Sequence, residues 1–515
     1  HQLDLANITL DFKHFMASDR THTMTLAAKS KPKSVNYISS TGEHRKESAL
    51  LVQFDFKLDS KLLLSTLNNF TQLPVEFKLQ GFITQSHQQT TIHFDQNSSF
   101  TSDNIAHSAE QKTSDKNLFT VKQLKTRIHG DVQFLNKKTI FLNLTADSQA
   151  KKIRIDKIIE LKNFTISSKI SGDVSNIKIN ASATADHIPL GNIAITGALA
   201  QPKITLSAKA LPLTELLSLN IKLPTKIDLV EGTLSYSIKA QATDLTNLQN
   251  TPFVISVEII SASGEVAGIW LQELNWQQNF NFLAGTLTSF DNADLTLAGH
   301  SKDNLTVALI DTATPISKLS ITTSWNYQKD FKVSATKLKG NILGGSFSIP
   351  KIQWPLEHGH SVDVQLTSID LEQVLALDKK QGIVVTGKIS GQLPINYDGK
   401  KYTMAKGELH NVGNGLIQVI NNPAVQELKA SNSQLQLAFD ALQNLHYHQL
   451  SSDVSMADDG YMLLETVIKG RNPDINNDVN LNLNLSYDLL GLLESLSITE
   501  QFEKRIVNGL QKNKE

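Results

Sequence analysis

The fold class is decided by the segment Val479-Asn480-Leu481-Asn482-Leu483-Asn484-Leu485-Ser486-Tyr487. Apolar and polar residues alternate strictly along this segment, and successive side chains of a β-strand point to opposite faces of its sheet. One face of the strand would therefore carry Val, Leu and Tyr, while the other would carry Asn and Ser. The segment predicts a β-strand with one apolar and one polar face.

The same period of two recurs along most of the chain. It is clearest at 204–208, 234–238 and 435–439, and further strands are predicted at 295–297, 305–309, 319–323, 331–337, 362–366 and 383–389. Turn signals such as Asp398-Gly399 and Asp459-Gly460 separate many of these segments. Strands of about 5 to 8 residues, recurring in this way, predict an antiparallel meander of roughly 35 strands.

Helical periodicity is scarce. Two short helices are predicted, at 213–219 and 371–377, and an amphipathic helical cap or tail is predicted at 489–515. Within that tail, Ser497-x-x-Glu500 has the form of a capping box. No stretch reaches the about 18 to 20 apolar residues that a membrane-spanning helix needs. Because the chain starts at His1, we expect a processed product or part of a longer protein, with any membrane anchor upstream.

Charge and cysteine content exclude several classes of protein. The chain has 515 residues, with 49 Lys and Arg against 50 Asp and Glu, which gives a net charge of −1. This balance predicts no basic patch for nucleic acid or for anionic membrane surfaces. The chain contains no cysteine, which excludes disulfide scaffolds and cysteine-ligated metal sites. The absence of cysteine also suits an oxidising compartment such as a periplasm.

The apolar face of the predicted sheet is aliphatic rather than aromatic. Aromatic residues make up only 6% of the chain, so a smooth Leu, Ile and Val surface would line one side of a long sheet. Left uncovered, this surface would far exceed the few hundred Å² of apolar patch that is typical of monomers. We therefore predict a groove that closes on acyl chains. Strand alternation assigns the lipid-contacting positions Ile204, Leu206, Leu234, Tyr236, Ile238, Leu435, Leu437, Phe439, Val479, Leu481, Leu483 and Leu485.

Catalytic and metal-binding motifs are weak throughout. His358-x-His360 and His446-x-His448 would each place two imidazoles on one face of a strand, but no third ligand is near in sequence. Gly413-Asn414-Gly415 lacks the context of a nucleotide-binding loop and favours a bulge or turn. No cofactor or metal and no enzymatic activity are predicted.

The C-terminal third resembles a known family. The motifs are Gly344-Gly345-Ser346-Phe347-Ser348-Ile349-Pro350 with Trp354-Pro355, then Gly391-x-Leu393-Pro394-Ile395, Ala441-Leu442-x-Asn444 and Gly470-x-Asn472-Pro473. In order and spacing, over about residues 341–506, they resemble the YdbH family of AsmA-like envelope proteins, which is related to TamB-like and YhdP-like proteins. The first 340 residues are similar only in character.

The resemblance implies a fold and a function. It implies a long curled antiparallel sheet, a repeating, taco-like β-groove with an apolar interior, which moves phospholipid from the inner to the outer membrane across the periplasm of a Gram-negative bacterium. We expect a groove region at 1–340, a YdbH-like groove region at 341–488 and the helical tail at 489–515. The full-length protein would be anchored in the inner membrane by an N-terminal helix that this chain lacks.

The resemblance also implies a partner. A small outer-membrane lipoprotein is expected to add a strand to the sheet near its C-terminal end, and strand addition needs an exposed sheet edge. The residues assigned to that edge are Val479, Asn480, Asn482, Asn484 and Tyr487. Two other functions stay open: a structural or adhesive β-repeat protein whose apolar face is packed as core, and a protein that binds or transports a small molecule such as a dicarboxylate.

Overall fold

The computed structural model describes two compact units, each formed from discontinuous parts of the chain. The first contains His1–Pro224, Leu234–Ser256 and Asn281–Thr296, and the second contains Thr225–Thr233, Val257–Phe280 and Leu297–Glu515. The structure describes residues 24–38, 44–61, 70–72, 74–85, 89–108, 117–135, 139–155, 159–221, 226–242, 251–284, 295–300, 304–327, 331–377, 382–420, 436 and 439–488.

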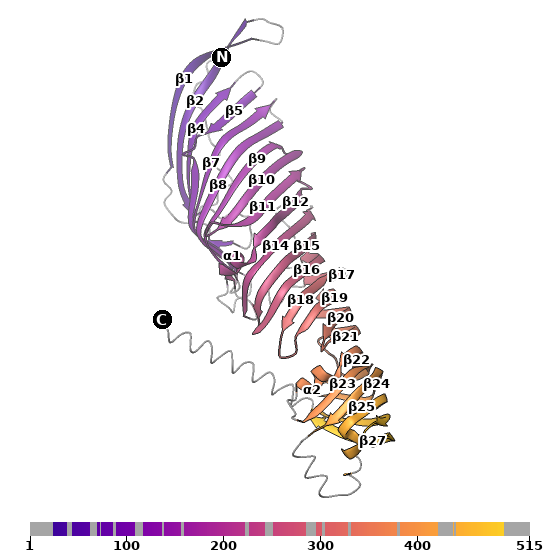
Figure 1. Ribbon diagram of the computed structural model, residues 1–515. Coiled ribbons are helices and arrows are strands. Elements are labelled where there is room, and N and C mark those ends of the chain that lie inside the picture. Colours follow the sequence, from indigo (N-terminus) through magenta and orange to yellow (C-terminus); the bar gives the residue numbers. More distant parts are fainter. Residues whose placement is uncertain are drawn as a thin grey trace, which may run out of the picture. The chain divides into compact units, whose positions relative to one another are not determined.

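The first unit is a series of strands, most of them long (Figure 1). They are β1 (Met24–Ile38), β2 (His44–Lys61), β3 (Phe70–Gln72), β4 (Pro74–Gln85), β5 (Gln89–Phe94), β6 (Ser99–Ser108), β7 (Asn117–Leu135), β8 (Thr139–Ile155), β9 (Ile159–Asp173), β10 (Asn176–Ala185), β11 (Ile188–Gly197), β12 (Lys203–Pro212) and β13 (Asn220–Ile221). Four further strands are each divided between the two units: β14 (Ile227–Gln241), β15 (Pro252–Val266), β16 (Ile269–Ala284) and β17 (Leu295–His300).

The second unit continues the same pattern. Its strands are β18 (Leu305–Asp311), β19 (Ile316–Tyr327), β20 (Phe331–Ile342), β21 (Gly345–Trp354), β22 (His360–Asp370), β23 (Ile383–Tyr397), β24 (Tyr402–Val419), β25 (Leu445–Met456), β26 (Tyr461–Asn472) and β27 (Asn477–Asp488).

Strands that are consecutive in the chain pair in antiparallel register. In the first unit β7 pairs with β8, β8 with β9, and β9 with β10; in the second, the strands from β20 to β27 pair successively. Figure 1 shows β7 to β12 lying side by side and bending along their length. The predicted curled antiparallel sheet is therefore confirmed. The predicted strand length is wrong, because β7 has 19 residues and β8 has 17, and the described chain has 27 strands.

The strands were predicted too short because left-handed residues inside them interrupt the period-two pattern. Gln123 in β7, Asn163 in β9 and Ala210 in β12 have φ angles of 51°, 44° and 49°. Each interrupts the regular strand backbone, and we call these positions bulges: Gln123 and Asn163 are left out of the ladder, so the alternation of side chains shifts by one position there, while the register on either side is unchanged. In β7, for example, the apolar residues are Val121 before the bulge and Leu124 after it. Further bulge residues in strands are Ser261, Glu273, Lys318, Lys337 and Ser368.

Each bulge interrupts the period-two pattern within a strand, and the pattern resumes after it with the apolar side chains on the same face. The backbone N–H groups that the bulges free are satisfied by side chains of neighbouring strands. The N–H of Ala210 donates to Ser235 Oγ at 3.0 Å, that of Ser261 to Asn275 Oδ1 at 2.9 Å, and that of Ser368 to Ser390 Oγ at 2.9 Å. Bends stabilised in this way give the sheet its curl without breaking the apolar face.

At two places in the sheet, two consecutive short strands pair with the same neighbouring strand. A buried polar side chain forms hydrogen bonds in the gap between them. β5 and β6 both pair with β7, and between them the Ser98 hydroxyl donates to the Gln80 carbonyl at 2.8 Å and accepts from the Gln80 N–H at 3.0 Å. β17 and β18 both pair with β19, and before β18 the Asn304 side chain accepts from the Thr323 N–H at 2.6 Å and donates to Gln278. These side chains replace missing ladder hydrogen bonds.

Helices are few and short in the described chain. α1 (Leu213–Ser218) and α2 (Leu371–Ala376) confirm the two predicted short helices, and a helical segment at Phe439–Ala441 leads into the 3₁₀ helix η2 (Leu442–Asn444). No helix in the described residues is long and apolar enough to cross a membrane. The predicted tail at 489–515 lies outside the described residues, and the predicted boundaries at 340 and 488 stay predictions.

Candidate functional site

The apolar face of the first unit is the clearest candidate site. Register places Ile193 opposite Leu206 and Ile195 opposite Ile204, and on the next pair it places Ile179 opposite both Ile170 and Ile195. Residues directly opposite in an antiparallel pair share one face, so these side chains form a continuous aliphatic surface. All of them are only half-buried.

No second layer covers this surface in the described chain. The substantial contacts between elements join hydrogen-bonded neighbouring strands, or a short helix and a strand. A β-sandwich would instead show contacts between strands of two facing sheets. The large aliphatic side chains of β9 to β12 thus stay half-exposed on one side of a single described sheet layer.

Tyr236 has a structural role on this face. Leu234, Tyr236 and Ile238 of β14 are half-buried, and the Tyr236 hydroxyl donates to the Leu190 carbonyl at 2.5 Å. A side chain at Gly191 would come within 2.6 Å of that hydroxyl. Burial raises the pKa of the Tyr236 phenol. Tyr236 therefore ties β14 to β11, and the lipid contacts assigned to these three residues stay predictions.

In the second unit, protein covers part of the apolar face. Val479 is 8% exposed and belongs to a core cluster with Ile417, Ala441, Leu442, Leu445, Tyr447 and Ile468, and Leu481 and Leu483 pack against it. Leu485, on the same face of β27, is 50% exposed. The predicted set thus divides: Val479 is core, while Leu485 is open. Leu481 and Leu483 lie between them.

The strand predicted at 435–439 is wrong where the structure describes it. Gln436, Phe439 and Asp440 are helical rather than extended, and Phe439 packs against the core cluster around Tyr447. Its period-two spacing misled the prediction, because this segment packs onto the sheet instead of joining it. Leu435 and Leu437 lie outside the described residues.

Tyr447 is the centre of this cluster, and sequence reasoning missed it. Its side chain is 1% exposed, and its hydroxyl donates to the Thr386 carbonyl at 2.8 Å. Side chains added at Gly387 or Gly415 would collide with that hydroxyl, so the two glycines make room for the ring. Burial raises the pKa of the Tyr447 phenol. The signal in the sequence was a pair of glycines on neighbouring strands, which only the register brings together.

The predicted strand-addition edge lies on β27. This strand pairs with β26 from Tyr461↔Asp488 to Asn472↔Asn477, and the described residues show no strand on its other side. Asn480, Asn482 and Asn484 are exposed on the polar face, opposite in direction to Val479. The register partner of Tyr487 is Met462. The assignment of this edge to a partner stays a prediction.

The histidine pairs form no metal site in the described chain, where no group of three potential ligands comes together. His358 Nδ1 contacts the Asp398 carbonyl oxygen, and His360 Nδ1 accepts from the Glu357 N–H at 3.0 Å. Gly413 has a φ of 80° within a bulge of β24, as Gly413-Asn414-Gly415 predicted.

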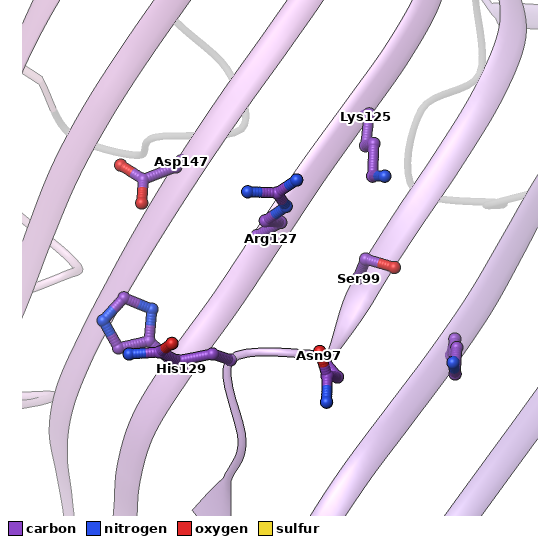
Figure 2. Close-up of a pocket in the computed structure, with 8 residues that line it drawn as sticks. Asn97, Ser99, Lys125, Arg127, His129 and Asp147 are labelled. Atoms are coloured by element: carbon purple, nitrogen blue, oxygen red, sulfur yellow. The ribbon is translucent and has the colours of Figure 1, made fainter.

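The polar face of the first unit carries a basic hollow. The prediction from the net charge that the chain has no basic patch is therefore wrong. Figure 2 shows Lys125, Arg127 and His129 projecting from one strand, with Asp147 on a neighbouring strand. Lys78, Gln96, Asn97 and Ser99 complete the lining of this hollow of 640 Å³. A net charge near zero does not reveal how charges are distributed, so the sequence could not exclude a local basic patch.

The comparisons with known proteins identify the family. The family model described as "YdbH-like: Intermembrane phospholipid transport protein YdbH" matches residues 27–511. The match extends the resemblance of the C-terminal third to nearly the whole chain. No curated protein and no solved structure matches. The chain therefore belongs to the YdbH-like family of intermembrane phospholipid transport proteins.

Proposed function

We propose that the chain carries phospholipid from the inner to the outer membrane across the periplasm of a Gram-negative bacterium, with the full-length protein held at the inner membrane. The observation that supports this proposal is the continuous aliphatic face of β9 to β12, which is half-exposed and uncovered by a second layer in the described chain. Acyl chains would lie along this face while headgroups stay in water.

The energetics of this proposal need no catalytic group. Exposing apolar surface to water costs about 25 cal/mol per Å², so acyl chains that move along an aliphatic wall avoid the cost of crossing water, and the transfer needs no chemistry. Aromatic residues are only 6% of the chain, and a face lined by aliphatic side chains suits movement of acyl chains along it. The direction of transport would be set by whatever supplies and removes lipid at the two ends.

Native mass spectrometry with lipid extraction tests the proposal on the purified chain. We expect phospholipid to co-purify, and a lipid-free preparation to take up labelled phospholipid from vesicles. A folded chain that stays lipid-free in both assays would contradict the proposal and favour a structural β-repeat protein. Retention of a small polar molecule instead would favour the dicarboxylate-type alternative.

We also propose that a small outer-membrane lipoprotein adds a strand to the open side of β27. A photo-crosslinking residue at Asn484 of β27 is expected to give an adduct with a lipoprotein in cells of the source organism. The matched control is Asp453 of β25, which is also exposed on the polar face but is paired on both sides, with Glu408 and Glu465. An adduct of equal yield at both positions, or none at Asn484, would contradict strand addition at β27.

A further inference from the structure

The bulges of the first unit concentrate charge on its polar face. At a bulge, two consecutive side chains point to the same side of the strand. In β7 to β9, Gln123, Lys151 and Asn163 are left out of the pairing, each beside one of the paired residues Lys122, Lys152 and Lys162. All six side chains, together with Asp103 and Asn104, line one hollow of 690 Å³. We name Lys122, Lys151, Lys152 and Lys162 the lysine row.

The lysine row opposes like charges across three strands. Lys122 is directly opposite Lys152, and Lys152 is directly opposite Lys162. Like charges directly opposite in a sheet are destabilising, so the arrangement is unfavourable for folding alone. Residues that violate a local rule of this kind are expected mainly at functional sites.

In the described chain, a carboxylate of the sheet forms an ion pair with one of these four lysines. Glu160 forms an ion pair with Lys152 at 2.6 Å, and its hydrogen bond with Lys152 lowers the pKa of the Glu160 carboxyl. In the described part of the chain, the ammonium groups of Lys122, Lys151 and Lys162 have no ion-pair partner, and all three side chains are exposed. Asp103 is the single carboxylate that lines the hollow.

The basic surface continues into the hollow of Figure 2. Lys125 and Arg127 follow Lys122 along the polar face of β7. Lys78 of β4, which is opposite Ser99 in register, lines the same hollow. Asp147 is opposite Arg127 in register, but its carboxylate accepts a hydrogen bond from Ser167 Oγ at 2.6 Å. Together the two hollows are lined by seven Lys and Arg side chains and two Asp side chains.

We propose that this surface docks on the headgroups of an anionic phospholipid bilayer. Six of the seven cations are lysines, which act as compact point charges rather than as the forked donors that a single buried phosphate site favours. Several lysines spread over neighbouring strands match an array of lipid phosphates, and each contributes about tenfold or less to membrane affinity. The apolar face, which points to the other side of the sheet, stays free for acyl chains.

The test is vesicle co-sedimentation of the full chain carrying Lys122→Gln, Lys151→Gln and Lys162→Gln. The matched control replaces Lys203, Lys209 and Lys239, which are exposed on the polar face of β12 and β14 in the same unit. On vesicles of phosphatidylcholine with phosphatidylglycerol, the lysine-row variant is expected to bind roughly a hundredfold more weakly, and the control within about threefold of the parent. Parent binding is expected to fall with added salt and to be absent on pure phosphatidylcholine.

Thermal unfolding separates docking from misfolding. Because the substitutions remove opposed like charges, the variant is expected to unfold at the same temperature as the parent or higher. Equal losses in the variant and the control, salt-independent binding, or tight binding to heparin without binding to anionic vesicles would each overturn the proposal. Uptake of labelled phospholipid into the groove is measured in parallel on the same variants. It is expected to be unchanged in detergent-dispersed lipid, where bilayer docking plays no part.

Discussion

A chain in which Ile204 and Leu206 are both replaced by Asp is expected to lose its co-purifying phospholipid and to take up labelled phospholipid at least about a hundredfold less well. Both side chains are half-buried on the aliphatic face of β12, opposite Ile195 and Ile193. A carboxylate pressed against acyl chains costs several kcal/mol because it has no partner there. Since neither residue is fully buried in protein, the change is expected to lower the stability of the sheet only modestly.

The control for this prediction lies on the same strand. Thr205→Asp with Ser207→Asp adds the same charge to β12, but on the polar face, where Thr205 and Ser207 are opposite Ala194 and Asn192. This variant is expected to bind phospholipid as the parent does. The face assignment would be refuted if the Thr205 and Ser207 variant lost lipid while the Ile204 and Leu206 variant retained it. If both variants retained lipid fully, the groove itself would be in doubt.

A companion experiment addresses the second unit. Leu485 is the open end of the β27 face, so Leu485→Asp is expected to reduce lipid content, whereas Val479→Asp is expected to unfold the unit because Val479 is core. The two residues look alike in the alternating sequence. Their difference comes from the helical segment at Phe439–Ala441 and η2, which packs over only one end of the strand.

The sequence predicted the fold class correctly, because a period of two is a direct consequence of strand geometry. It could not predict the bulges. A left-handed Gln123 or Asn163 leaves no composition signal, and it appears in the pattern only as an interruption that looks like a strand end. The lysine row could not be predicted either, because Lys122, Lys151 and Lys162 are far apart in the sequence and only the register brings them together.

The strand predicted at 435–439 was wrong for a different reason. In the segment 435–439 the spacing of Leu435, Leu437 and Phe439 is that of a strand. Ala438 interrupts the alternation, however, and Leu435, Phe439 and Leu442 are also spaced for one face of a helix. The structure of this segment is set by what it packs against, since Phe439, Ala441 and Leu442 complete the cluster around Tyr447. Tertiary packing overrides local pattern in such segments.

Tyr447→Ala is expected to give a large loss of stability in the second unit. The side chain is 1% exposed, and removing a buried aromatic ring from a packed cluster costs about 3–5 kcal/mol. Tyr447→Phe keeps the ring and removes only the hydrogen bond to the Thr386 carbonyl, so a loss of about 1–2 kcal/mol is expected. Tyr461, which is 50% exposed, provides the control, and Tyr461→Ala is expected to change the stability by less than about 1 kcal/mol.

Hydrogen exchange of the β23, β24 and β25 amides measures these effects where they arise, because local opening can be followed there without assuming that the whole chain unfolds in one step. In Tyr447→Ala the amides around Thr386, Gly415 and Tyr447 are expected to lose protection together, since the ring joins all three strands. Equal protection in Tyr447→Ala and the parent would show that the cluster does not stabilise this end of the sheet.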